Sequence, residues 1–259
     1  MGYDAVVARC IKAFRALSPI LPVLMAAGGT KVRQKVEPDC QDNVDSLREA
    51  LRKDSKIGEQ IKDVPDKALR RFLRAHLTVP EAHKVYVKCE KWRKKYGVEN
   101  IKSEDAAIQC ELATGKGIIL EERDKMGRPI ILATVHLHDT KNRDMEVLTK
   151  FTVYMLETLS NMSDQGEMDN ICVLFDMKDF SLRNMDYQFV KTLIMLLQRY
   201  FPERLGVCLI VNAPTLFSGC WLIIRPWLDE RTRKKVNFIY TEEELSQYIS
   251  LAVLPRKLF

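Results

Sequence analysis

The sequence lacks an apolar run long enough to cross a membrane as a helix. Its longest strongly apolar stretches, residues 16–27 and 205–213, extend for no more than about a dozen residues, whereas a spanning helix needs roughly 20. The 259 residues are 46% hydrophobic and 29% charged, with only 11 glycines and 10 prolines. This composition excludes a disordered or collagen-like chain and is typical of globular proteins.

Paired cysteines and clustered histidines are also missing. Seven cysteines are present, an odd number, and no two of them form a Cys-x-x-Cys motif. Cys172 and Cys208 lie inside apolar runs, where cysteine acts as a small buried hydrophobe. This usage predicts a cytoplasmic protein without a zinc framework. His136 and His138 lie two apart on a predicted strand, but no third ligand is obvious, so we expect no metal site.

Common catalytic motifs are absent as well. The sequence has no P-loop, no complete dinucleotide fingerprint and no Gly-x-Ser-x-Gly nucleophile elbow. One carboxylate, Asp176, ends an apolar run at a place where α/β enzymes often carry a functional acid. We interpret Asp176 instead as an acceptor that caps the following loop. The sequence therefore predicts a protein that is not an enzyme and needs no cofactor.

The charge of the chain is mildly basic. Its 41 Lys and Arg residues against 35 Asp and Glu residues give a net charge of +6. This charge permits attraction to an anionic membrane surface or to RNA without establishing either. Residues 4–17 carry apolar side chains at helical spacing, which predicts an amphipathic helix. Such a helix would either lie on a membrane or pack against the body of the protein.

A block of helices is predicted after a polar linker at residues 28–43. Either Asp42 or Asn43 is suited to cap the first helix, and Pro65 to begin the second. Thr78 and Glu81 form a capping box for the third helix. That helix should end at Gly97, and Ser103 should cap a short helix after it.

From residue 117 onward, strands alternate with helices. The predicted strands are residues 117–122, 129–135, 171–176, 205–212 and 236–239, and the predicted helices are 144–162, 186–200, 214–227 and 241–249. The strand at 171–176 is apolar enough to be buried on both faces. The alternation predicts an α/β fold with a mostly parallel sheet and flanking helices, preceded by a helical segment.

One predicted helix, at residues 215–228, is apolar around nearly its whole circumference. Its apolar residues include Leu216, Phe217, Cys220, Trp221, Ile224, Trp227 and Leu228. A surface helix normally has a single apolar stripe. A helix that is apolar all round is either buried on all sides or also contacts a cavity, a partner or lipid. The pattern alone leaves both interpretations open.

A series of motifs follows in a fixed order along the chain. They are Phe201-Pro-Glu-Arg-Leu-Gly206, Asn212-Ala-Pro214, Phe217-x-x-x-Trp221 and Arg225-Pro-Trp-Leu-Asp229-x-x-Thr232-x-x-Lys235. Together with the segments 69–75, 89–93 and 124–129, they resemble the CRAL-TRIO lipid-binding family, and most closely its fungal-type phosphatidylinositol transfer proteins. The resemblance covers roughly residues 44–255. It implies an N-terminal extension and linker at 1–43, a helical segment at 44–113 and a CRAL-TRIO domain with an apolar lipid cavity at 114–259.

The resemblance also implies a headgroup site. Glu203, Thr232 and Lys235 stand where phosphatidylinositol-binding members hold the inositol phosphate. Lys235 offers a charge to phosphate, Thr232 a hydroxyl, and Glu203 an acceptor for inositol hydroxyls. Other roles stay open: a local ion pair between Glu203 and Arg204, a helix cap for Thr232 and a solvated Lys235. His76 is a further candidate because, with the residue after it, it replaces the family's basic pair.

Cavity and gate residues follow from the same resemblance. The candidates lining the cavity are Ile171, Val173, Phe175, Cys208 and Ile210. Ile171 and Val173 stand where phosphatidylcholine binders have polar residues, so phosphatidylcholine is a doubtful ligand. The helix at 214–228 resembles a mobile gate over the cavity.

The sequence therefore predicts a lipid-transfer or lipid-presenting protein that encloses one phospholipid, with phosphatidylinositol as the expected ligand. It would be a monomer that touches membranes transiently and binds no nucleic acid. A carrier of a sterol, retinoid or tocopherol, and a membrane-recruited adaptor that senses lipid, are the alternatives. A further alternative is an enzyme that uses Asp176 as its catalytic carboxylate.

Overall fold

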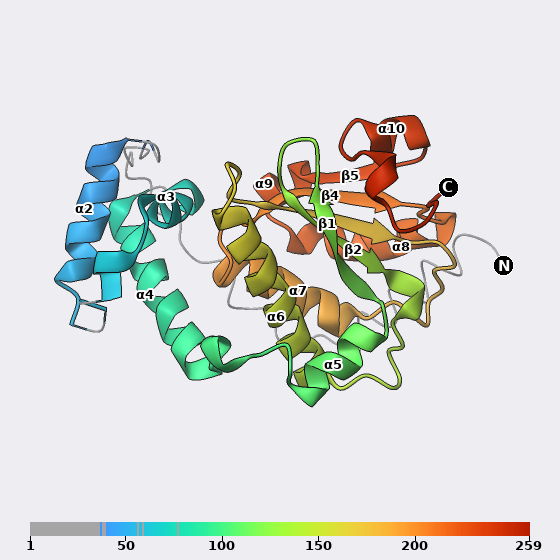
Figure 1. Cartoon of the computed structure of the whole chain (residues 1–259), viewed down its shortest axis with the longest axis horizontal. Coiled ribbons are helices and arrows are strands. Elements are labelled where there is room, and N and C mark those ends of the chain that lie inside the picture. The colour runs from blue at the N-terminus through green and yellow to red at the C-terminus, as the bar shows by residue number, and fades with distance from the viewer. Residues whose placement is uncertain (1–36, 38–39, 56, 59, 77) are drawn as a thin grey trace.

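A helical bundle at one end of the molecule precedes an α/β body (Figure 1). The computed structural model describes residues 37, 40–55, 57–58, 60–76 and 78–259. The predicted amphipathic helix at 4–17 and most of the linker at 28–43 lie outside the described residues. The helices of the bundle are α2 (Gln41–Arg52), α3 (Asp66–Ala75) and α4 (Val79–Tyr96), and α5 (Ala106–Ala113) follows. The short 3-10 helices Gln60–Asp63 and Val98–Asn100 connect them.

Both ends of α4 agree with the sequence prediction. The hydroxyl of Thr78 accepts a hydrogen bond from the Glu81 amide at 3.3 Å, so Thr78 caps the start of α4 as predicted. Gly97 ends α4 in the left-handed conformation, with φ of 71°, a geometry that glycine adopts without steric cost. Inside the bundle, Val44, Leu47 and Leu69 are fully buried.

Two predicted caps are wrong. Helix α2 begins at Gln41, and Cys40 occupies its N-cap without a side-chain hydrogen bond. Asn43 lies inside the helix and donates to the carbonyl oxygen of Glu37 at 2.9 Å. Ser103 donates its hydroxyl to Glu104, and α5 begins only at Ala106. In both cases the polar side chain found another local partner, which short polar side chains do readily.

A five-stranded sheet forms the centre of the body, in the order β1-β2-β3-β4-β5. The strands are β1 (Gly117–Arg123), β2 (Pro129–Thr134), β3 (Ile171–Asp176), β4 (Leu205–Val211) and β5 (Val236–Ile239). β1 and β2 form the predicted antiparallel hairpin, and β2 to β5 run parallel. The predicted α/β fold with a mostly parallel sheet is confirmed, and the bounds of β3 and β5 agree with the sequence prediction.

Helices connect the parallel strands and pack on the sheet. They are α6 (Met145–Asp164), α7 (Tyr187–Arg199), α8 (Thr215–Ile224), α9 (Glu230–Lys234) and α10 (Glu242–Ser246), with 3-10 helices at Val135–Leu137, Arg225–Trp227 and Leu251–Val253. Asp144 and Asp186 cap α6 and α7 through their carboxylates. The 3-10 turn after β2 contains His136 and precedes His138, so these residues do not share a strand face as predicted.

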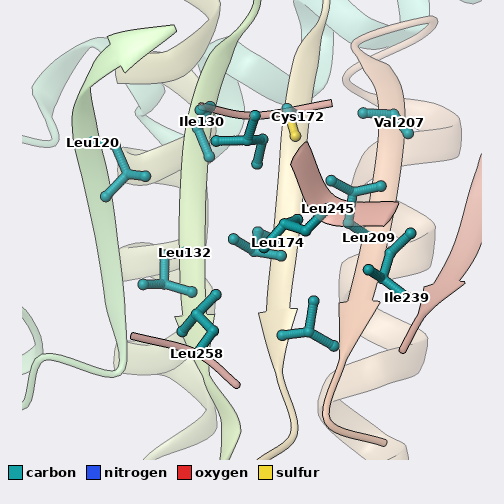
Figure 2. Packing of buried hydrophobic residues seen from close by; sticks show 12 residues of the cluster. Leu120, Ile130, Leu132, Cys172, Leu174, Val207, Leu209, Ile239, Leu245 and Leu258 are labelled. Carbon is teal, nitrogen blue, oxygen red and sulfur yellow. The ribbon is translucent and has the colours of Figure 1, made fainter. Parts of the chain in front are cut away.

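The two faces of the sheet have different cores. On one face, Cys172, Leu174 and Leu209 pack with Leu245 of α10 and with Leu258 near the C-terminus, as Figure 2 shows. The opposite face lies against α6, α7 and α8. Side chains on a strand alternate between faces, so each strand contributes to both cores.

A network of arginines and aspartates joins the bundle to the body. Arg71 of α3 and Arg204, which precedes β4, both bind the carboxylate of Asp164 at the end of α6, at distances of 2.6 to 2.9 Å. Arg204 also donates to the carbonyl oxygen of Asp169 at 3.0 Å. Burial of Arg71, together with the charge of Arg204, lowers the pKa of the Arg71 guanidinium to about 10. Both guanidiniums are almost fully buried and depend on the shared acid.

Replacement of Arg204 by alanine should therefore destabilise the whole chain. We expect Arg204→Ala to lower the free energy of unfolding by about 3 kcal/mol, because it breaks a buried ion pair and leaves its partners unsatisfied. Urea denaturation measures the change. The control is Lys53→Ala, which removes an exposed pair with Glu49 and should cost less than about 0.5 kcal/mol. Equal effects of the two variants would contradict a structural role for the network.

Candidate functional site

Two of the predicted headgroup residues meet at one end of the sheet. Glu203 lies in the turn before β4, and Lys235 follows α9 directly before β5. The Lys235 ammonium donates to Oε2 of Glu203 at 3.1 Å, and both side chains are about four-fifths buried. The parallel pairing of β4 with β5 places the beginnings of the two strands side by side. The fold thus joins two motifs that are 32 residues apart in the sequence.

Glu203 has a backbone conformation that separates it from its neighbour Arg204. Its φ is 56°, in the left-handed region that non-glycine residues seldom occupy. Glu203 binds Lys235, whereas Arg204 binds Asp164, so the local ion pair between Glu203 and Arg204 that the sequence left open is not formed. Strained conformations of this kind persist only where the surroundings hold them in place.

Thr232 occupies the first turn of α9. Its amide donates to Oδ1 of Asp229 at 2.7 Å, and its hydroxyl donates to Oδ2 of the same carboxylate at 3.1 Å. Asp229 is thus the residue that caps α9, and Thr232 helps to hold it. The hydroxyl oxygen of Thr232 retains its acceptor capacity for a ligand.

Arg231 belongs to the same cluster, although the sequence analysis did not select it. Its Nη1 atom donates to Oε1 of Glu203 and to the carbonyl oxygen of Arg74, each at 2.5 Å. Burial would raise the pKa of Glu203, but the bonds from Arg231 and Lys235 outweigh it and hold that pKa below the usual range. Glu203 is therefore a carboxylate shared by two cations. The signal in the sequence was the basic run that surrounds Thr232.

His76 lies directly after α3, near the same cluster. Its Nε2 atom is buried and has no hydrogen-bond partner in the described structure. Burial lowers the pKa of His76, and the nearby charge of Arg231 acts in the same direction, against Glu81 and Glu203. Burial thus favours the neutral form of the imidazole. Leu77, which completes the position of the family's basic pair, lies outside the described residues.

The five predicted cavity residues lie on a single face of the sheet. In the register of β3 with β4, Ile171 pairs with Leu205, Val173 with Cys208, and Phe175 with Ile210. All of them point toward the core beneath α6, α7 and α8. Val173 and Phe175 are only half-buried, so the prediction that β3 is buried on both faces is wrong. The helices above this central strand therefore leave Val173 and Phe175 partly exposed, although both pack against the core.

The predicted gate is shorter than expected and is broken near its C-terminal end. Helix α8 ends at Ile224, and a 3-10 turn continues to Trp227 because Pro226 cannot extend the α-helix. Phe217, Cys220 and Ile224 are buried, and Leu216, Trp221, Trp227 and Leu228 are half-buried.

Aromatic contacts anchor α8 on the sheet and on the loop after β3. Trp221 meets Phe238 of β5 at a ring-centroid distance of 5.4 Å, and Phe217 meets Phe180 at 5.5 Å. On the outer side, Leu222 is 55% exposed. The outer side of α8 is therefore mostly polar, with Thr215 and Ser218 exposed beside the single apolar side chain of Leu222.

Other candidate sites have structural roles or lie elsewhere. Oδ1 of Asp176 accepts from the Lys178 amide and the Asn212 side chain, and Oδ2 binds Arg256 at 2.6 Å. These contacts support its interpretation as a loop-capping acceptor. Within the described ranges, no group of His, Cys, Asp or Glu is arranged to hold a metal ion. A pocket of about 390 Å³ lies at the C-terminal segment beside Leu258, away from α8.

Comparison with known proteins identifies the fold family. The family model of the CRAL/TRIO domain matches residues 113–258. The chain belongs to the CRAL/TRIO family. No described helix is both long enough and apolar enough to span a membrane.

Curated relatives include three fungal proteins. The CRAL-TRIO domain-containing protein C3H8.02 of Schizosaccharomyces pombe is 34% identical over 73% of this chain and 44% of its own length. The phosphatidylinositol transfer protein CSR1 of Eremothecium gossypii is 30% identical over 76% of this chain and 47% of its own. The Sec14 cytosolic factor of Schizosaccharomyces pombe is 28% identical over 84% of this chain and 81% of its own. The chain thus spans about half the length of the first two relatives.

A solved structure supports the same fold. The crystal structure of Sfh5 superposes with a TM-score of 0.68 at 19% sequence identity, over 80% of this chain and 82% of that chain. At this identity the similarity concerns the fold alone. The CRAL/TRIO fold places the Glu203 cluster at the start of β4 and β5, and α8 over the half-buried face of the sheet.

The Asp176 site generates a pH-dependent prediction. Burial would raise the pKa of Asp176, but hydrogen bonds from Asn212 and Arg256 outweigh it and lower that pKa. We expect Asp176→Asn to reduce the free energy of unfolding at neutral pH by about 2 kcal/mol, the range of hydrogen bonds to charged groups. A group whose pKa is lower in the folded state stabilises the protein above its unfolded pKa, and this contribution is lost as the pH falls through the folded pKa.

The wild type and Asp176→Asn should therefore differ most in their free energy of unfolding above about pH 5. This difference should become smaller below about pH 4. Urea denaturation across this range measures it. Asp63→Asn, at an exposed aspartate, is the control and should show little difference at any pH. A gap between wild type and Asp176→Asn that stays constant down to acid pH would contradict the role of the ionised carboxylate.

Proposed function

We propose that this protein encloses a single phospholipid, phosphatidylinositol, and exchanges it at membrane surfaces. The observation that carries this proposal is the Glu203 cluster, where Lys235 and Arg231 share one carboxylate beside the unpaired nitrogen of His76. The cations suit a phosphate, and Glu203 and His76 suit inositol hydroxyls. The relative named as a phosphatidylinositol transfer protein is consistent with this ligand.

The acyl chains would occupy the sheet face beneath α8. That face offers half-buried apolar side chains from β3, among them Val173 and Phe175. A two-chain phospholipid has on the order of 30 methylenes, each contributing about 0.8 kcal/mol on leaving water. The total of roughly 24 kcal/mol prevents escape of the lipid into solution. Exchange would therefore need contact with a bilayer.

The protein would act in the cytoplasm as a monomer that associates peripherally with membranes. Its net charge of +6 would favour anionic leaflets through an attraction that salt weakens. The role is binding and transfer, without covalent chemistry, without a cofactor other than the bound lipid, and without nucleic acid. Mass spectrometry of lipid that copurifies with the protein tests the ligand directly. A sterol or another uncharged hydrophobe in place of phospholipid would overturn the proposal.

The headgroup contact predicts a selective defect in one variant. Lys235→Ala should reduce transfer of phosphatidylinositol between vesicles by about tenfold or more, because a lost charge-assisted hydrogen bond costs about 1.5–3 kcal/mol. Lys234→Ala is the matched control, since Lys234 is exposed and pairs only with Glu230 on its own helix. If both variants transfer phosphatidylinositol like the wild type, the headgroup assignment is wrong.

The gate predicts a change at Trp221 when the protein meets a membrane. The chain has three tryptophans, so a variant with Trp92→Phe and Trp227→Phe reports on Trp221 alone. We expect anionic vesicles to shift its emission and to expose it to quenchers attached to lipid, because α8 would leave Phe238 for the bilayer. High salt should weaken the response. An unquenched Trp221 in protein that demonstrably binds the vesicles would show that α8 is a static helix.

A further inference from the structure

Arg231 connects three parts of the molecule at the Glu203 cluster. It lies on α9, and its Nη1 atom donates both to Glu203 before β4 and to the carbonyl oxygen of Arg74 near the end of α3. The second contact spans 157 residues of sequence. Arg231 is therefore held at the place where the helical bundle meets the body.

The guanidinium of Arg231 still has donors to offer. A guanidinium carries five N–H donors in a planar fork, and both contacts of Arg231 involve Nη1. Its side chain is 51% exposed, so a ligand can reach the remaining donors on Nε and Nη2. A planar fork of this kind matches the geometry of a phosphate, which it can bind through two parallel hydrogen bonds.

The charges around Arg231 favour an anion. Glu203 is one negative charge beside the two positive charges of Arg231 and Lys235, which leaves one positive charge in excess while His76 is neutral. Burial, with the charge of Arg231 acting in the same direction, lowers the pKa of His76, whose Nε2 has no partner in the described structure. His76 follows Arg74, whose carbonyl oxygen holds Arg231, so its unsatisfied nitrogen is a further group near this cluster that a polar headgroup can satisfy.

We propose that Arg231 binds the phosphate of the lipid headgroup and is a determinant of selectivity for acidic phospholipids over uncharged lipids. This inference rests on the proposed function. In the structure, Glu203 and the Arg74 carbonyl hold the guanidinium in position. On binding, the phosphate takes the Nε and Nη2 donors of Arg231. Lys235 keeps one of its three donors on Glu203 and offers another to the headgroup. In this chain, His76 and Leu77 replace the basic pair that the resemblance leads one to expect. Arg231 supplies a cation near that position.

Competition between two lipids tests this role. Wild type and Arg231→Ala are incubated with vesicles that contain equal amounts of phosphatidylinositol and diacylglycerol, and native mass spectrometry measures the lipid bound. Diacylglycerol has the same two acyl chains but no phosphate. We expect Arg231→Ala to lower the ratio of bound phosphatidylinositol to diacylglycerol by about tenfold, the loss of one charge-assisted contact. Arg233→Ala, an exposed position on the same helix, removes the same charge and should preserve the ratio.

The possible results separate the two proposals. If wild type prefers phosphatidylinositol and Arg231→Ala keeps that preference, the role of Arg231 is wrong and the proposed function stands. A parallel loss of both lipids, with a lower melting temperature, would show that Arg231 only braces the bundle and would also overturn it. If wild type takes up no phosphatidylinositol, the proposed function itself fails. A parallel experiment adds excess inorganic phosphate to the wild type and the vesicles. The amount of phosphatidylinositol bound should not change. A strong reduction would indicate that Arg231 belongs to a site for free anions instead.

Discussion

The shared carboxylate of Asp164 is the contact on which the rest of the arrangement depends. It receives Arg71 from the bundle and Arg204 from the turn before β4. Two nearly buried guanidiniums repel each other, and the carboxylate between them offsets this repulsion. The same turn carries Glu203. Because Arg204 is fixed on one side, Glu203 is directed to the other, with the left-handed backbone that this requires. The ionic junction thus positions the bundle and the candidate site together.

The charges of the candidate site affect both the stability of the fold and the binding of an anion. Glu203 neutralises one of the cations beside it, so the cluster can be largely buried without a ligand. A site built only from Lys235 and Arg231 would repel itself, and a fully neutral site would give an anion no advantage. In the proposed site, one excess positive charge near the unpaired nitrogen of His76 would keep the cluster folded and still favour a phosphate.

Local signals in the sequence predicted those parts of the fold that depend on near neighbours. The Thr78 and Glu81 box and the Gly97 stop each act within one turn of helix, and β3 is bounded by its own apolar run. Arg231 was missed because its partners, Glu203 and the Arg74 carbonyl, lie 28 and 157 residues away. Asn43 failed as a cap because it has an equally good local acceptor in Glu37. The half-burial of Val173 was also unpredictable, because it depends on how closely α7 and α8 approach the sheet.

That half-burial links the fold to lipid exchange. A sealed sheet face would offer no space for acyl chains, and an open one would expose its apolar strands to water. Helix α8 covers the face through aromatic contacts at Phe217 and Trp221, yet it exposes Leu222 to solvent. The cost of that exposure disappears when the outer side of α8 enters a bilayer, where apolar surface is favoured. Under the proposed function, a membrane would stabilise the displaced helix relative to the closed one, and the same event would open the sheet face to lipid. Binding to the membrane and release of the ligand would then become one equilibrium, set by how firmly the aromatic contacts of α8 hold it on the sheet.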